Sequence, residues 1–283
     1  MPNRLDLTRR SFAIAAFAAS TVHAKAQPRP AAIFDCHMHI IDPHYPLIAN
    51  EGYLPPPQTI ADYRAKATPL GIRAGAVVSG SFQGYDQTYL RATLAALGSS
   101  WVGVTQIPDD MPDPAIAALG QAGVRALRFN MFRGVIGSLD ALIALATRAH
   151  AVANWHPEIY TDAAALAPHV ARLVKLPASI VIDHLGMTAA GLPVLLDLVD
   201  AGAKVKATGF GRVSMDVPKT LEAIAARDPS ALMFGTDLPS TRARRPFQAA
   251  DITLIRDVLG AELAQRALWD NAVAKYRLTP ERP

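Results

Sequence analysis

Short apolar runs alternate with longer stretches of helical apolar spacing from residue 31 onward. Runs rich in β-branched residues predict strands, and apolar positions three to four residues apart predict helices, as in 88–98, 138–154 and 164–176. The predicted strands span 32–40, 75–81, 101–107, 124–131, 158–163, 179–185, 203–209 and 231–237. Strands that alternate with helices predict parallel pairing through right-handed crossovers. Eight such repeats favour an α/β fold, a (β/α)8 TIM barrel, over an open doubly wound sheet, which remains the alternative.

The first 26 residues have a different character. Arg9 and Arg10 precede an apolar stretch over 12–22, and Ala24-Lys25-Ala26 offers a cleavage site between small residues. Because about 20 apolar residues are needed to cross a bilayer, we interpret 1–26 as a signal peptide cleaved near Ala26, with a retained membrane anchor as the alternative. The remaining residues, 27–283, are expected to form one barrel domain, since TIM barrels of about 250 residues are common.

The arginine pair also suggests a route of export. The order Thr-Arg-Arg-Ser-Phe over 8–12 resembles a twin-arginine signal, which would place the mature protein in a bacterial periplasm. An ordinary secretory signal is the alternative.

Charge and cysteine content narrow the function classes. The net charge of +4 comes largely from the first 26 residues, so the mature chain is close to neutral and gives no support to nucleic-acid binding. Cys36 is the only cysteine, so no intramolecular disulfide can form, and we expect it to be a small buried residue.

The first predicted strand carries two histidines in the run FDCHMHI. Because residues i and i+2 of a strand face the same side, His37 and His39 are expected to point to the barrel mouth together with Asp35. Cys36 and Met38 are expected to pack outward against the helices. Barrel enzymes place their chemistry at the carboxyl ends of the strands.

Other predicted strands also end in polar residues. His184 ends strand six and Asp237 ends strand eight, and Arg128 and Asn130 share one side of strand four, with Leu127 and Phe129 facing the helices. The remaining candidates are Ser79 on strand two, His156 and Tyr160 at strand five, and Arg212 after strand seven. Three histidines and an aspartate at strand ends are costly to bury as packing, so together they predict a site.

These motifs resemble the amidohydrolase superfamily of distorted barrels, in particular its amidohydrolase-related family 2, from about Phe34 to Asp237. The segments VRALRFNM, WHPEIY, VIDHLG, KATGFGRVS and FGTDLPS are most similar to the branch of 2-pyrone-4,6-dicarboxylate lactonases, galactarolactone isomerases and other sugar or muconolactone lactonases. The resemblance implies a hydrolase that opens a carboxylated lactone, or an isomerase of such a compound.

The resemblance also implies roles for the site residues. Asp237 would be the general base that activates water, while His37, His39 and His184 would stabilise the oxyanion formed from the lactone carbonyl. Substrate would be held by Arg128, Arg212, Tyr160, Ser79, His156 and Arg133. Arg133 is one position before Gly134, where pyrone-dicarboxylate enzymes carry a second arginine. Two arginines over one mouth imply an anionic substrate, because guanidinium pairs bidentately with carboxylate.

The same residues are a zinc ligand set in metal-dependent relatives. His37, His39, His184 and Asp237 would complete a tetrahedral site. Relatives with two metals bridge them through a lysine on strand four or a glutamate on strand five, and the Arg128 and Tyr160 found there argue against a binuclear site. We expect an enzyme without cofactor. The alternatives are a zinc-dependent decarboxylase or other metal-dependent amidohydrolase, and a non-catalytic binding protein for a small organic acid.

Three further arginines follow strand eight. We interpret Arg242, Arg244 and Arg245 as a solvated loop, with an extension of the anion site as the alternative.

Overall fold

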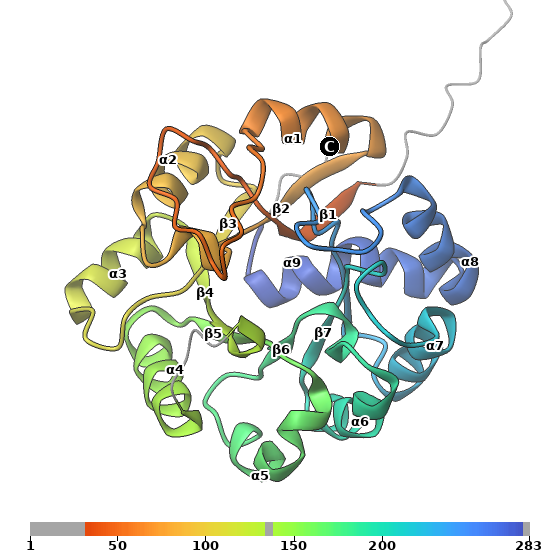
Figure 1. Cartoon of the computed structure of the whole chain (residues 1–283). Helices are drawn as coiled ribbons and strands as arrows, with labels where there is room; N and C mark the ends of the chain where they lie inside the picture. The colour runs from red at the N-terminus through yellow and green to blue at the C-terminus, as the bar shows by residue number, and fades with distance from the viewer. Residues whose placement is uncertain (1–31, 134–137, 280–283) are drawn as a thin grey trace, which may run out of the picture. The chain divides into compact units, whose positions relative to one another are not determined.

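The computed structural model describes residues 32–133 and 138–279 of the chain. Eight parallel strands follow one another in chain order in a single sheet, which curves into a barrel surrounded by helices (Figure 1). The predicted (β/α)8 barrel is therefore confirmed. The predicted signal peptide and its cleavage site near Ala26 lie outside the described residues and stay predictions.

Every predicted strand is present, and each ends earlier than predicted. The strands are β1 (Ile33–Met38), β2 (Ile72–Val78), β3 (Trp101–Thr105), β4 (Val124–Asn130), β5 (His156–Tyr160), β6 (Val181–Ile182), β7 (Lys204–Ala207) and β8 (Leu232–Phe234). The polar residues that close the predicted strands leave the sheet and enter the loops around the barrel mouth. For this reason His184 and Asp237 follow their strands instead of ending them.

Helices cover the outside of the sheet and, at the end of the chain, the bottom of the barrel (Figure 1). They are α1 (Ile60–Ala67), α2 (Thr88–Leu97), α3 (Asp113–Gln121), α4 (Leu139–Ala153), α5 (Val170–Leu173), α6 (Leu192–Asp200), α7 (Val217–Arg227), α8 (Ala249–Gln265) and α9 (Asn271–Tyr276). Among the described residues, no helix has both the length and the apolar character needed to cross a membrane.

Two of the three predicted helices are confirmed. In α4, the Ser138 side chain accepts a hydrogen bond from the Ala141 N–H at the start, and Asn154 adopts the left-handed conformation at the end. The prediction of one helix over 164–176 is wrong. This segment forms a 3-10 helix at Ala163–His169 followed by the short α5, because Pro168 lacks the N–H that a continuous α-helix needs there.

The strands separate two apolar cores. The outer core lies between the sheet and the helices, and it includes Leu127 and Phe129, as predicted. The inner core fills the amino end of the barrel, where Phe34 stacks on Tyr276 of α9 with ring centroids 5.6 Å apart. This plug leaves only the carboxyl end of the barrel for a site.

A shift in register changes which way β1 side chains point. The pairing of β1 with β2 is irregular between Asp35 and Met38, as in a β-bulge, so the inward–outward alternation shifts by one residue. Cys36 therefore faces the inner core, and Asp35 turns toward α1, where Tyr63 donates a hydrogen bond to its carboxylate over 2.8 Å. The predictions that Asp35 shares a side with His37 and that Cys36 packs outward are wrong; Met38 does pack in the outer core.

The segment after β8 closes against β1. The Asp237 N–H donates to the His37 carbonyl over 2.7 Å, and the His39 N–H donates to the Leu238 carbonyl over 2.8 Å. Gly235 allows this approach, since a Cβ there would lie 2.8 Å from the His37 backbone nitrogen. The seam therefore holds Asp237 directly beside the two histidines of β1.

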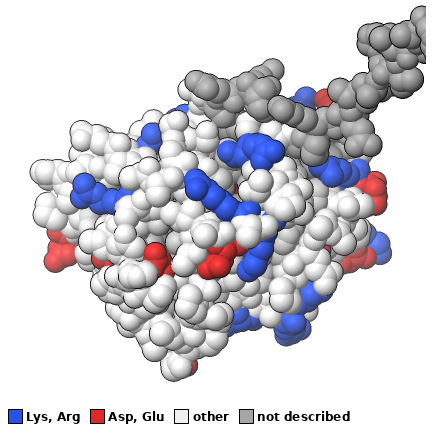
Figure 2. Space-filling view, turned by 90° about the horizontal axis from the view of Figure 1, so that it is seen from above, with Lys and Arg blue, Asp and Glu red and all other residues white. Residues whose placement is uncertain are grey.

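Charged side chains are scattered over the side of the barrel seen in Figure 2, with wide uncharged areas between them. The described residues visible on that face form no continuous basic surface of the kind that binds nucleic acid.

Candidate active site

The loops at the carboxyl ends of the strands surround a small polar cavity. It is lined by His39, Asn50, Tyr53, Gly80, Ser81, Phe82, Arg128, Asn130, Tyr160, His184, Arg212, Asp237, Thr241 and Arg242. His37 lies directly beneath, with its ring centroid 5.1 Å from that of His39 and 4.8 Å from that of His184. The structure thus brings together the three predicted histidines, Asp237, both arginines and Tyr160.

Asp237 occupies the centre of this group. Its φ of 59° is in the left-handed region, which aspartate tolerates better than most residues. Its Oδ1 lies 3.8 Å from His37 Nε2 and 3.7 Å from His39 Nε2, and neither Oδ1 nor His37 Nε2 has a hydrogen-bond partner within the described chain. Buried atoms left without partners point to a place where a bound molecule supplies the missing hydrogen bonds.

Arg212 holds the other oxygen of Asp237. Its Nε donates to Oδ2 over 3.0 Å, and its Nη2 donates to the same oxygen. Burial alone would raise the pKa of Asp237, but the charge of Arg212, assisted by the neighbouring histidines, holds it well below its usual range. The carboxylate is therefore ionised and, while Arg212 holds it, a weak base.

Burial keeps two of the histidines, His37 and His184, neutral. Burial lowers the pKa of His37 to about 3, and it also holds the pKa of His184 well below its usual value, with the charge of Arg212 adding to the effect. His39 places Nδ1 2.7 Å from the Val78 carbonyl, which can only accept, so Nδ1 carries a hydrogen.

Arg128 and Tyr160 form the opposite wall. Arg128 is held by Asp183, whose Oδ2 lies 3.2 Å from its Nη2, and by the Ser79 carbonyl, which accepts from Nη1 over 2.8 Å. The Arg128 guanidinium lies 5.4 Å from the centroid of the Tyr160 ring, and that ring meets His184 edge-on at 4.9 Å. The guanidinium is fixed before any ligand arrives.

Two predicted substrate-binding residues do not reach the cavity. Ser79 follows the earlier end of β2 and turns its hydroxyl outward, 2.6 Å from the Tyr89 hydroxyl on α2; only its carbonyl serves the site, through Arg128. His156 is the first residue of β5, at the opposite end of the barrel from the mouth, where its Nε2 lies 3.1 Å from Glu158. Both assignments are corrected. The side chain of Arg133 lies outside the part of the chain that the structure describes.

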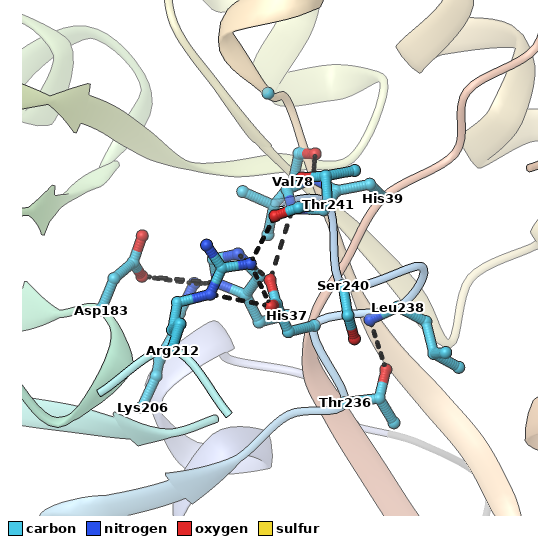
Figure 3. Close-up of polar contacts among 12 residues, drawn as sticks. His37, His39, Val78, Asp183, Lys206, Arg212, Thr236, Leu238, Ser240 and Thr241 are labelled. Atoms are coloured by element: carbon cyan, nitrogen blue, oxygen red, sulfur yellow. Dashed lines mark hydrogen bonds and ion pairs between the residues drawn. The ribbon is translucent and has the colours of Figure 1, made fainter. Parts of the chain in front are cut away.

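A buried charged network below the mouth was missed by the sequence reasoning. Lys206 of β7 is fully buried, with Nζ in contact with Glu158 Oε2 and 3.3 Å from Asp183 Oδ1 and 3.2 Å from His37 Nδ1 (Figure 3). Burial alone would lower the pKa of Lys206, but the two carboxylates hold it above its usual value. A lysine inside an apolar strand requires buried counter-charges, and that was the available signal.

A metal ion is the cofactor that this arrangement could suit. His37, His39 and Asp237 form one group whose ligand atoms lie within 4.8 Å of one another, and His37, Asp183 and His184 form a second. His39 has the hydrogen on Nδ1, as metal-bound histidines do. However, Arg212 pairs with Asp237 Oδ2, and Lys206 Nζ lies 3.2 Å from His37 Nδ1. The donors are spaced for a metal, but two cations already lie against them and would compete with one.

Of the three arginines after β8, one lies at the predicted anion site and two lie in the surrounding loop. Arg242 lines the mouth, 4.5 Å from the Tyr53 ring centroid, and its Nη1 donates to Glu51 over 2.8 Å. Arg244 is exposed and Arg245 pairs with Asp251. Only Arg242 belongs to the cavity.

Known proteins resemble this chain in sequence and in fold. The amidohydrolase family model matches residues 34–278. The chain is 26% identical over 279 residues to a 2-pyrone-4,6-dicarboxylate hydrolase of Comamonas testosteroni, with 87% of this chain and 90% of that protein covered. A protein of Agrobacterium tumefaciens, solved as an apo structure, superposes with a TM-score of 0.78 at 28% identity, covering 89% of this chain and 98% of that one.

A second solved structure shows the same fold. It is a probable 2-pyrone-4,6-dicarboxylic acid hydrolase of Acinetobacter baumannii with citric acid bound, and it gives a TM-score of 0.77 at 17% identity over 87% of this chain and 99% of that one.

Proposed function

This chain belongs to the amidohydrolase family, and from that premise we propose that it hydrolyses the ester bond of a small carboxylated lactone with water activated by Asp237. The observation that carries the proposal is the unpartnered Oδ1 of Asp237, buried between two histidines at the mouth of the barrel. The similarity to a 2-pyrone-4,6-dicarboxylate hydrolase supports the lactone as the substrate class.

The proposed reaction has two steps, the attack of water on the lactone carbonyl and the collapse of the resulting intermediate. Asp237 takes a proton from water as the water oxygen attacks the lactone carbonyl carbon. The carbonyl oxygen becomes an oxyanion, which the His37 Nε2–H stabilises with help from His184. The intermediate collapses, the ring carbon–oxygen bond breaks, and the ring oxygen takes the proton from Asp237. The product is the open hydroxy acid or, where the ring oxygen is attached to a carbon–carbon double bond, an enol acid that can tautomerise to the keto acid.

Arg212 links substrate binding to this chemistry. In the unliganded chain its guanidinium holds Asp237 Oδ2. A carboxylate on the substrate competes for the same guanidinium, and each hydrogen bond that Arg212 transfers to the substrate raises the basicity of Asp237. An anionic substrate would therefore activate the base as it binds. Arg128 and Tyr160 would hold the opposite side of the ring.

We propose that the reaction proceeds without a metal. The first experiment measures the metal content of the mature protein purified without chelator, and the hydrolysis of a panel of carboxylated lactones with and without chelator. Turnover that is unaffected by chelator, without stoichiometric metal, is expected. About one zinc per chain with activity lost on its removal would replace this proposal with a zinc-dependent reaction, which the ligand spacing of His37, His39 and Asp237 favours as the second candidate.

The pH profile offers an independent prediction. Asp237 has a lowered pKa, so its ionised form persists as the pH falls, and His37, with a pKa of about 3, stays neutral over the same range. We expect kcat/KM to stay level from about pH 8 to about pH 5 when measured for a lactone whose carboxylate is ionised throughout. An acid limb centred near the ordinary histidine value of about 6.5 would contradict the roles given to His37 and His184.

A further inference from the structure

Lys206 approaches two carboxylate oxygens and one ring nitrogen inside the barrel. Its Nζ contacts Glu158 Oε2, lies 3.3 Å from Asp183 Oδ1 and lies 3.2 Å from His37 Nδ1. An ammonium group has three hydrogens to donate and accepts none. Lys206, Glu158 and Asp183 are all fully buried, so these contacts are made away from bulk solvent.

The contact with His37 fixes where that ring carries its hydrogen. A neutral imidazole has one N–H and one lone pair. If the hydrogen were on Nδ1, it would face the ammonium of Lys206 at 3.2 Å, which is repulsive. Asp183 Oδ1 lies 3.4 Å from the same nitrogen, has no hydrogen-bond partner among the described residues and is the competing acceptor for a hydrogen on Nδ1. The ammonium of Lys206 is nearer, at 3.2 Å, and favours the tautomer in which Nδ1 accepts and Nε2 carries the hydrogen.

The two histidines of the His-x-His pair are held by different partners. His39 donates from Nδ1 to the Val78 carbonyl and turns Nε2 toward Asp237. His37 turns Nε2 toward the same carboxylate, 3.8 Å from its Oδ1, and has Lys206 at Nδ1. A metal bound by this pair needs a lone pair from both rings, whereas a lactone oxyanion needs a hydrogen.

We propose that Lys206 is a positioning residue that holds His37 in the Nε2–H tautomer, so that His37 donates to the oxyanion and offers no lone pair to zinc. The catalytic half of this inference rests on the proposed function, and the metal half does not. Lys206 touches neither substrate nor reacting atoms and acts only through His37.

The test begins with the unaltered mature protein. Nitrogen-15 NMR of labelled histidine side chains, with the His37 signals assigned by their loss in a His37→Gln variant, should show hydrogen on Nε2. Zinc affinity is then measured by calorimetry for the wild type and for Lys206→Met, which keeps the length of the side chain. Because K206M leaves buried Glu158 without its cation, while Asp183 keeps Arg128, the double variant K206M/E158Q is made beside it to restore the charge balance. Lys204→Met on the same strand, which loses an ion pair with Asp228 outside the site, is the control.

In the Lys206 variants we expect the His37 hydrogen to move to Nδ1 toward Asp183 and zinc affinity to rise about tenfold or more, the size of effect that groups hydrogen-bonded to metal ligands exert. We also expect kcat on a lactone to fall about 10²- to 10³-fold, as for loss of one oxyanion donor, with little change in KM. K204M should change none of these quantities.

Two results would overturn the inference: hydrogen on Nδ1 of His37 in the wild type, or a folded Lys206 variant with unchanged tautomer and zinc affinity. Failure of the proposed function looks different, because a wild type that hydrolyses no lactone would still give the tautomer and zinc results expected here.

Discussion

Replacing Asp237 by asparagine is expected to lower kcat for lactone hydrolysis by about 10²- to 10⁴-fold, the usual contribution of a general base. The amide has nearly the same shape but cannot take a proton from water. Asp237 Oδ1 is the unpartnered carboxylate oxygen of the cavity, beside the Nε2 atoms of His37 and His39, so no neighbouring group stands in the same place. Steady-state kinetics with a lactone that the wild type hydrolyses measures the effect.

The variant also separates an enzyme from a binding protein. Calorimetry with a carboxylate product should still detect binding to D237N, because Arg128 and Arg212 remain. D237N removes the buried partner of Arg212, so its unfolding temperature must be measured beside Asp197→Asn, an exposed carboxylate on α6 that serves as the matched control. A folded D237N with kcat within threefold of wild type would remove Asp237 as the base. A wild type that binds small acids and hydrolyses no lactone would support the binding protein instead.

The barrel could be predicted because its signals are local. Each strand is an apolar run, and the segments between strands have the apolar spacing of helices. An error of a few residues at the end of a run does not change the count of eight strands. The helix over 164–176 failed for an equally local reason, since Pro168 stands inside the apolar pattern.

The predictions of which side chains reach the mouth were correct for the histidines and Asp237. They were wrong for residues whose side-chain direction depends on how the strand continues or pairs. His37, His39, His184 and Asp237 all meet at the mouth. The bulge in β1 that turns Asp35 outward arises from its pairing with β2, which alternation within one strand cannot reveal. Ser79 points outward because Val78, the last residue of β2, faces the inner core and the next side chain in the alternation faces the helices.

The buried network was missed although its members were visible. Glu158, Asp183 and Lys206 each lie within a predicted apolar strand, and these three strands, 158–163, 179–185 and 203–209, follow one another in the predicted barrel. Charges on adjacent strands that all face the barrel interior must pair with one another, since an isolated buried charge costs several kcal/mol. What the sequence could not provide is the height of Lys206 in the barrel, which places Nζ 3.2 Å from His37.

Replacing Arg212 by methionine is expected to lower kcat/KM by about 10²- to 10³-fold, because a buried charge pair that loses one partner costs about 2 to 5 kcal/mol. Most of the loss should appear in KM, since the substrate carboxylate loses its bidentate partner. The same substitution should also change the pH dependence of the reaction. Without Arg212, burial raises the pKa of Asp237 with less opposition, so the base becomes stronger and is protonated at higher pH. The acid limb of kcat/KM should therefore move upward in pH relative to wild type.

Two measurements separate the possible roles of Arg212. The KM tests whether Arg212 binds substrate, and the acid limb of the pH profile tests whether it tunes Asp237. Arg227→Met removes an ion pair with Asp200 on the outer surface and should leave both KM and the pH profile unchanged. If R212M instead kept the wild-type KM while the acid limb moved, Arg212 would tune Asp237 without touching substrate, and Arg128 would be the anchor of the substrate carboxylate. If neither quantity changed, the ion pair between Arg212 and Asp237 would have no part in the reaction, and the coupling of anion binding to base strength would be wrong.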